Sequence, residues 1–202
     1  EHKEDLRPLN TGLSSLKGLG LVSQSGKRGR PPLHLWNPPY CGEIDIRITA
    51  DGTWFHEGTP IGRPALVRLF ASILIGGDDG RHYLITPVEK VGITVEDAPF
   101  QAVGLAVENR GRNDQHLVLT TNVGDEVAVG PDHPLDFQID EPTAGLKPYV
   151  LVRDWLKARV SRAITYDLVE LAGVEAVKGE DMFGVRSGGV FFPICPAGEV
   201  GN

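Results

Sequence analysis

The stretch EIDIRITADGTWFHEG, residues 43–58, decides how the chain folds. Isoleucines occupy every second position from Ile44 to Ile48 and alternate with polar residues, a pattern typical of a half-buried antiparallel strand. Asp51-Gly52 then predicts a tight turn, because both residues tolerate positive φ. The residues that follow run back as a second strand, so the stretch predicts a β-hairpin.

The length of the turn decides which face the aromatic residues take. A two-residue turn pairs Arg47 with His56 and places Phe55 among the isoleucines. Trp54 then shares the polar face with Arg47 and His56. A three-residue loop would instead shift the pairing and move Trp54 toward the core. We favour the two-residue turn, because it keeps the polar His56 away from the apolar face.

Two apolar stripes predict helices. The first covers residues 66–74. In the second, an aliphatic residue recurs every four positions over residues 156–168, which predicts a helix from Asp154 to about Ala172. A different face of that helix carries Arg159, Arg162 and Tyr166.

Short alternating runs around these helices predict strands, separated by turns rich in Gly, Asn and Asp. They cover residues 83–87, 91–95, 102–108, 116–121, 126–129, 135–139 and 148–153, and a last hairpin turns at residues 187–189. Each half of the chain thus contains a hairpin, further strands and one helix, an order that suggests a duplication. The prediction is an α+β fold with two lobes of antiparallel strands and one main helix in each lobe.

The predicted organisation is a flexible, basic tail rich in Pro and Gly (residues 1–35), an N-terminal α+β lobe (36–98) and a C-terminal α+β lobe (99–196). The chain has 202 residues and a net charge of −7, with +3 in residues 1–36 and −10 in the rest. An acidic body repels nucleic acid and anionic membranes, so neither is an expected partner. KRGRPP, residues 27–32, nevertheless resembles an AT-hook, and weak DNA tethering through the tail stays open as an alternative function.

Cysteine and histidine usage argues against a disulfide scaffold and against zinc. Cys41 and Cys195 are the two cysteines, and the six histidines lack metal-ligand spacing. No apolar run approaches the ~20 residues that cross a bilayer, so the expectation is a cytoplasmic protein without metal or cofactor. We assign no catalytic residue. The alternative enzyme is a small hydrolase or transferase acting on a phosphorylated compound, with His56 beside Glu89 or Asp97.

A binding site requires fewer residues than catalysis, and the hairpin supplies several. Trp54, His56 and Arg47 predict a stacking platform beside a cation, which suits an anionic aromatic ligand. Arg63, where the first helix begins, adds charge beside free backbone N–H groups. The competing interpretation makes Trp54 part of the core and pairs the arginines with carboxylates. The predicted ligand-binding residues are Arg47, Trp54, His56, Arg63, Lys90, Arg153 and Arg186.

Four blocks of the folded part carry a resemblance. They are WNPPYCGEIDIRITADGTWFHEGTPIGRPALVRLFASIL (36–74), HYLITPVEKVGITVEDAPF (82–100), LTTNVGDEV (119–127) and GVRSGGVFFPI (184–194). They resemble the uncharacterised bacterial family known as domain of unknown function 1285. The resemblance implies a two-lobed α+β fold with duplicated motifs and a C-terminal lobe similar to pleckstrin-homology folds. It also implies a cleft for a nucleotide-like ligand and a role in signal transduction, but no activity or catalytic residue.

The leading expectation combines these observations. It is a non-enzymatic sensor or adaptor that binds a small anionic, nucleotide-like ligand between the two lobes, with a protein as its signalling partner. Closure of the lobes on the ligand would be the signal.

Overall fold

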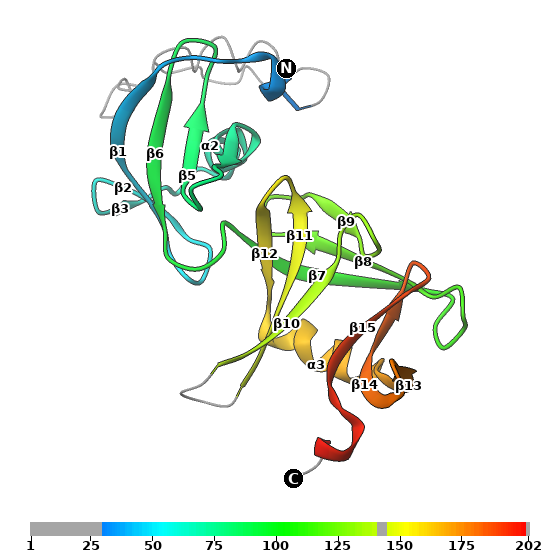
Figure 1. The fold of residues 1–202 in the computed structure, drawn as a ribbon. Coiled ribbons are helices and arrows are strands. Elements are labelled where there is room, and N and C mark those ends of the chain that lie inside the picture. Colours follow the sequence, from blue (N-terminus) through cyan, green and yellow to red (C-terminus); the bar gives the residue numbers. More distant parts are fainter. Residues whose placement is uncertain (1–29, 141–144, 201–202) are drawn as a thin grey trace, which may run out of the picture.

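A computed structural model describes residues 30–140 and 145–200. These residues form two lobes of mostly antiparallel strands with one α-helix each, which confirms the predicted fold class. Figure 1 shows the N-terminal lobe, blue to green, above the C-terminal lobe, green to red. The predicted tail lies outside the described residues up to residue 29. The likeness of the C-terminal lobe to pleckstrin-homology folds stays a prediction.

The N-terminal lobe contains a six-stranded sheet and one α-helix. Its elements are η3 Leu33–Leu35, β1 Tyr40–Ile48, β2 Trp54–His56, β3 Thr59–Pro60, α2 Pro64–Ser72, β4 Leu74–Gly76, β5 His82–Ile85 and β6 Lys90–Val95. The strand order is β3-β2-β1-β6-β5-β4. Pro64 occupies the first turn of α2, where its missing N–H costs no hydrogen bond, and Leu66, Phe70 and Ala71 form the buried face.

The C-terminal lobe contains a second six-stranded sheet, one α-helix and a smaller sheet. Its elements are β7 Phe100–Glu108, β8 His116–Thr121, β9 Glu126–Ala128, β10 Leu135–Asp140, β11 Gly145–Arg153, β12 Leu156–Val160, α3 Arg162–Glu170, β13 Gly173–Val177, β14 Glu180–Ser187, β15 Val190–Pro196 and η4 Ala197–Glu199. The sheets have the orders β10-β11-β12-β7-β8-β9 and β13-β14-β15. The buried hydroxyl of Ser187 joins them, because it accepts from the N–H of Leu117 and donates to the carbonyl of Val129.

The two six-stranded sheets share one topology. Each consists of two three-stranded antiparallel meanders, β1–β2–β3 with β4–β5–β6 and β7–β8–β9 with β10–β11–β12. In both sheets the first and last strands pair in parallel, β1 with β6 and β7 with β12. The repeated order supports the predicted duplication. The helices differ in position, since α2 connects the two meanders of the first sheet and α3 follows the second sheet.

The predicted register of the first hairpin is wrong. Arg47 pairs with Phe55 and Ile48 pairs with Trp54, one residue away from the register of a two-residue turn. The loop spans three residues because the Asp51 carboxylate closes it, accepting hydrogen bonds from the hydroxyl of Thr49 and the N–H of Thr53. The shift buries Trp54 with the isoleucines.

The predicted helix from Asp154 to Ala172 is wrong over its first half, which forms β12. A spacing of four residues fits a strand as well as a helix, because it is twice the strand period. Leu156, Ala158 and Val160 are buried, and the residues between them are half-exposed. Asp154 lies in the turn before β12 with φ of 44°. The helix begins later, with Ser161 as its N-cap.

The buried apolar side chains of both lobes belong to one cluster, so the lobes share a core. The β1–β2 turn contributes to this junction. The Gln101 side chain, on β7, donates from Nε2 to the carbonyl of Ala50 at 3.1 Å. None of the helices in the described part of the chain is long and apolar enough to cross a membrane.

Replacing Gly52 with alanine tests this junction. Gly52 has φ of 83°, and a Cβ there would lie 2.6 Å from Cγ of Gln101. We expect Gly52→Ala to lower the free energy of unfolding by about 2 kcal/mol, through backbone strain and overpacking together. Gly80 is the matched control, since its φ is 76° and its Cβ would meet no atom within 4 Å. Gly80→Ala should cost about 1 kcal/mol from the backbone alone in urea denaturation. Equal losses would show that Gln101 moves aside.

Candidate functional site

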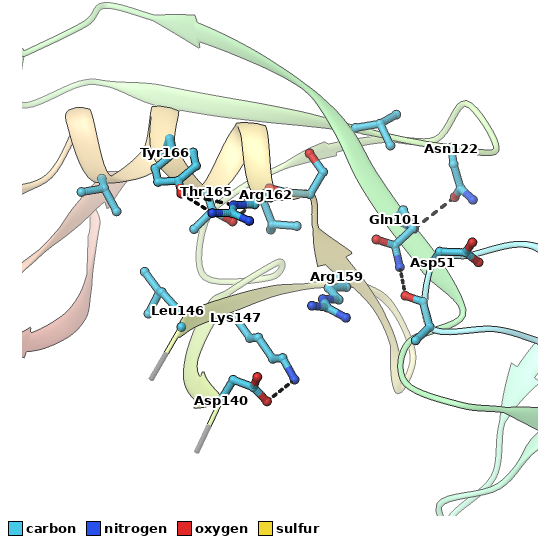
Figure 2. A pocket seen from close by; sticks show the side chains of 16 residues that line it. Asp51, Gln101, Asn122, Asp140, Leu146, Lys147, Arg159, Arg162, Thr165 and Tyr166 are labelled. Atoms are coloured by element: carbon cyan, nitrogen blue, oxygen red, sulfur yellow. Dashed lines mark hydrogen bonds and ion pairs between the residues drawn. The ribbon is translucent and has the colours of Figure 1, made fainter. Parts of the chain in front are cut away.

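A cleft of about 950 Å³ lies where the two lobes meet, a size that suits a small-molecule ligand. The N-terminal lobe contributes its β1–β2 turn, and the C-terminal lobe contributes β7, the β8–β9 turn, the facing ends of β10 and β11, the end of β12 and α3 (Figure 2). The lining residues are Ala50, Asp51, Gln101, Val103, Asn122, Asp140, Gly145, Leu146, Lys147, Arg159, Val160, Ser161, Arg162, Thr165, Tyr166 and Val169.

Helix α3 begins at the wall of this cleft. The Ser161 hydroxyl accepts from the N–H of Ile164 at 3.5 Å, and the Thr165 hydroxyl donates to the carbonyl of Ser161 at 2.9 Å. The first turn contains no acidic residue. The partial positive charge of the helix N-terminus is therefore not neutralised within that turn, which favours an anion nearby.

Arg162 and Tyr166 form a pair one helical turn apart on α3. The guanidinium donates to the Tyr166 hydroxyl from Nη2 at 3.0 Å and from Nε at 3.2 Å, and it lies 5.7 Å from the ring centre. Tyr166 is 57% exposed. Among residues 30–140 and 145–200, Arg162 has no carboxylate partner. Its charge is thus available to an anion, with an aromatic ring beside it.

The other two cations of the cleft are paired with carboxylates. Lys147 binds Asp140 (Figure 2), and Nη1 of Arg159 lies 3.0 Å from Oδ2 of Asp97. Asp97 also accepts from the Tyr149 hydroxyl at 2.8 Å. Burial, together with this hydrogen bond, raises the pKa of Tyr149 to about 12. Lys147 and Arg159 are therefore balanced by carboxylates, in contrast to Arg162.

The opposite wall is polar and held in place by hydrogen bonds. The N–H of Gln101 donates to Oδ1 of Asn122 at 3.1 Å, and the N–H of Asn122 donates to the carbonyl of Gln101 at 2.8 Å. The β1–β2 turn, which packs against Gln101, carries Asp51 (Figure 2). Hydrogen bonds from Thr49, and then from Thr53, hold the pKa of Asp51 below its usual value. The carboxylate is therefore ionised at neutral pH.

Family models match nearly the whole folded part of the chain. The N-terminal domain model of domain of unknown function 1285 (DUF1285) matches residues 31–98, and the C-terminal domain model matches residues 99–194. The chain belongs to this family. A crystal structure of a DUF1285 protein from Silicibacter pomeroyi DSS-3, at 45% identity, covers 93% of this chain and 100% of its own, with a TM-score of 0.81.

A second DUF1285 structure, from Shewanella baltica OS155, is 31% identical and covers 62% of this chain and 91% of its own, with a TM-score of 0.48. No curated protein matches the chain. The family and its two-domain architecture are shown by the two family models and the Silicibacter pomeroyi structure.

The seven predicted ligand-binding residues do not line the cleft of this DUF1285 chain. Trp54, at 2% exposure, belongs to the core, so the predicted face of Trp54, His56 and Arg47 is wrong. Arg47 pairs with Glu96 at 3.1 Å and lies 5.3 Å from the centre of the Phe55 ring. His56 is half-buried and pairs with Ile46 across the hairpin. The competing interpretation agrees with the structure here, because Trp54 lies in the core and Arg47 forms an ion pair with a carboxylate.

The remaining predicted residues lie in four separate places. Arg63 is exposed at the N-cap of α2. Lys90 lies 4.0 Å from the centre of the Tyr83 ring. The other two form ion pairs with carboxylates: Arg153 with Asp125 and Arg186 with Glu175.

The structure also places the residues of the alternative functions. Glu89 is buried in the turn before β6, and Asp97 is occupied by Tyr149 and Arg159. No hydrogen bond or ion pair among the described residues joins His56 to either carboxylate. Of the AT-hook-like segment, residues 27–29 lie outside the described residues, and Arg30 forms an ion pair with Asp125 at 2.7 Å.

Sequence reasoning found part of the site without recognising it. The sequence predicts Arg159, Arg162 and Tyr166 on one face of a helix, but Arg159 lies on β12 and only the other two lie on α3. The cleft also needs strand residues that are distant in the sequence, such as Gln101 and Lys147. The available signal is Ser161, a good N-cap residue before Arg162, with an arginine and a tyrosine four residues apart after it.

Proposed function

We propose that the cleft binds a small anionic, nucleotide-like ligand and that the protein is a non-enzymatic sensor or adaptor in signal transduction. The observation that carries the proposal is Arg162, a cation without a carboxylate partner among the described residues, at the N-terminus of α3 and at the wall of the cleft. A phosphate is the group that this combination of guanidinium and helix N-terminus suits best.

The rest of the lining supports a ligand with a flat ring. Tyr166 presents an exposed aromatic ring beside Arg162, and Val103 and Val169 add exposed apolar surface. On the opposite wall, Gln101 and Asn122 supply amide groups for hydrogen bonds. A phosphate, a ring and several polar groups together describe a nucleotide-like molecule.

The position of the cleft supports a sensor. Its lining comes from both lobes, so a ligand that fills it contacts both and favours the arrangement in which the walls fit it best. The described lining includes no histidine, the side chain most often used as a general base, and the hydroxyls of Ser161 and Thr165 are engaged in the first turn of α3. A cytoplasmic location and a protein partner that reads the liganded state are part of the same proposal.

Thermal melting tests the proposal. A nucleotide monophosphate at about 100 times its dissociation constant should add roughly 2.7 kcal/mol of stability, which raises the melting temperature of a chain of this size by about 5–10 °C. Arg162→Gln should remove most of this shift, measured against the melting temperature of the variant alone. Arg112, an exposed arginine outside the cleft, gives the matched control Arg112→Gln, which should keep the shift. A shift that survives in Arg162→Gln would overturn the assignment of the site.

A further inference from the structure

The charges in the cleft lining divide into paired and unpaired groups. Lys147 is paired with Asp140 inside the lining, and Arg159 is paired with Asp97 behind it. Two charged lining residues then remain, Asp51 and Arg162. Neither has a partner of opposite charge among residues 30–140 and 145–200.

These two residues have opposite charges and belong to different lobes. Asp51 lies in the β1–β2 turn of the N-terminal lobe, and Arg162 begins α3 in the C-terminal lobe. Figure 2 shows them at opposite sides of the cleft. The cleft is therefore electrostatically polar, with an acceptor at one end and a cation at the other.

The acceptor at the Asp51 end is fixed before any ligand arrives. Its Oδ1 accepts from the hydroxyl of Thr49 and from the N–H of Thr53, so the turn itself orients the carboxylate. The turn that carries it packs against Gln101 so closely that a Cβ at position 52 would lie 2.6 Å from Cγ of Gln101. A carboxylate oxygen held in place by its own turn needs little reorganisation to accept from a ligand.

We propose that the ligand of this cleft has two different ends, an N–H donor group that binds Asp51 and an anionic group that binds Arg162. This inference rests on the proposed function and adds its ligand class. One molecule with both ends satisfies both charges and contacts both lobes. A purely anionic ligand would leave Asp51 unpaired and would be repelled by it. The carboxylate therefore selects against such ligands and favours ligands that also carry an N–H donor group.

Two probes that differ at one end test the inference by calorimetric titration. GMP carries a phosphate and a guanine base whose edge presents N–H donors, whereas ribose 5-phosphate carries the phosphate alone. We expect GMP to bind at least tenfold more tightly than ribose 5-phosphate. Asp51→Asn keeps an oxygen for Thr49 and Thr53 but removes the charge, and it should abolish most of this preference while leaving the affinity for ribose 5-phosphate unchanged or slightly higher.

The matched control is Asp132→Asn, an exposed aspartate outside the lining, which should keep the preference. Equal affinities for the two probes in the wild type, or a GMP preference that survives in Asp51→Asn, would overturn the proposal that the ligand carries an N–H donor group for Asp51. The proposed function would stand in both cases as long as Arg162→Gln weakens phosphate binding. If neither probe binds with any dependence on Arg162, the proposed function itself fails.

Discussion

Trp54→Ala is expected to lower the free energy of unfolding by about 4 kcal/mol, the largest effect of any substitution proposed for this chain. The indole is 2% exposed and stacks on Phe70 of α2, with ring centres 6.1 Å apart and an interplanar angle of 23°. Truncation leaves a cavity between the sheet and α2 that Ile46 and Ile48 fill only in part. Urea denaturation measures the loss as a lower midpoint at an unchanged m value.

Trp155 provides the matched control, because it is 72% exposed in the turn between β11 and β12. Trp155→Ala should change the free energy of unfolding by no more than about 0.5 kcal/mol. Trp54→Phe should cost less than Trp54→Ala, about 1–2 kcal/mol, since it keeps an aromatic ring and removes an indole N–H that has no hydrogen-bond partner among the described residues. Similar losses for Trp54→Ala and Trp155→Ala would contradict the place of Trp54 in the core.

Much of the fold could be predicted because strand patterns are local. Ile46 and Ile48 are buried on β1 while Arg47 between them is exposed, as the alternation predicts. The strand predicted at 116–121 is β8, His116–Thr121, and the hairpin predicted at 187–189 turns between β14 and β15. These patterns repeat within a few residues, so they do not depend on the remainder of the chain.

Predictions that depended on tertiary context were wrong. The spacing of Leu156 and Val160 fits both a helix and a strand. These residues form a strand because β12 pairs with β7 on one side and β11 on the other. In the first hairpin, the turn was decided by the Asp51 side chain and the burial of Trp54. The parallel pairs between β1 and β6 and between β7 and β12 join strands that are distant in the sequence, which a local pattern does not reveal.

The sequence prediction placed a site between the lobes and named seven residues for it, none of which lines the cleft. The arginines chosen from the sequence, such as Arg47 and Arg186, are engaged by the carboxylates Glu96 and Glu175. In a chain with more acidic than basic residues, most cations find such partners. What distinguishes Arg162 is that it lines the cleft and has no carboxylate partner in the described part of the chain. Both properties depend on the folded neighbourhood and not on the sequence around it.

Arg153→Ala is expected to lower the free energy of unfolding by about 3 kcal/mol, because it removes a largely buried cation that joins the two lobes. The side chain is 13% exposed, with Nη1 3.1 Å from Oδ2 of Asp125 and the guanidinium 5.0 Å from the centre of the Phe100 ring. Its Nη2 donates to the carbonyl of Ala71 in the last turn of α2, across the lobe junction. Burial lowers the pKa of Arg153, and the nearby positive charge of Arg30 lowers it further. Without Arg153, the ion pair that Asp125 keeps within the described part of the chain is the more exposed one with Arg30.

Two further variants separate the causes of that loss. Arg153→Met keeps most of the packing over Phe100 but has no charge, so it avoids the free-energy penalty of desolvating a buried cation. It should therefore lower the free energy of unfolding by only about 1–2 kcal/mol. Arg112→Ala removes an exposed ion pair with Asp114 and should cost no more than about 0.5 kcal/mol. A loss in Arg153→Ala as small as in Arg112→Ala would contradict the role of this arginine. If the urea transition of Arg153→Ala splits in two, the arginine is what makes the lobes unfold together, whereas a single transition at an unchanged m value assigns that coupling to the shared apolar core.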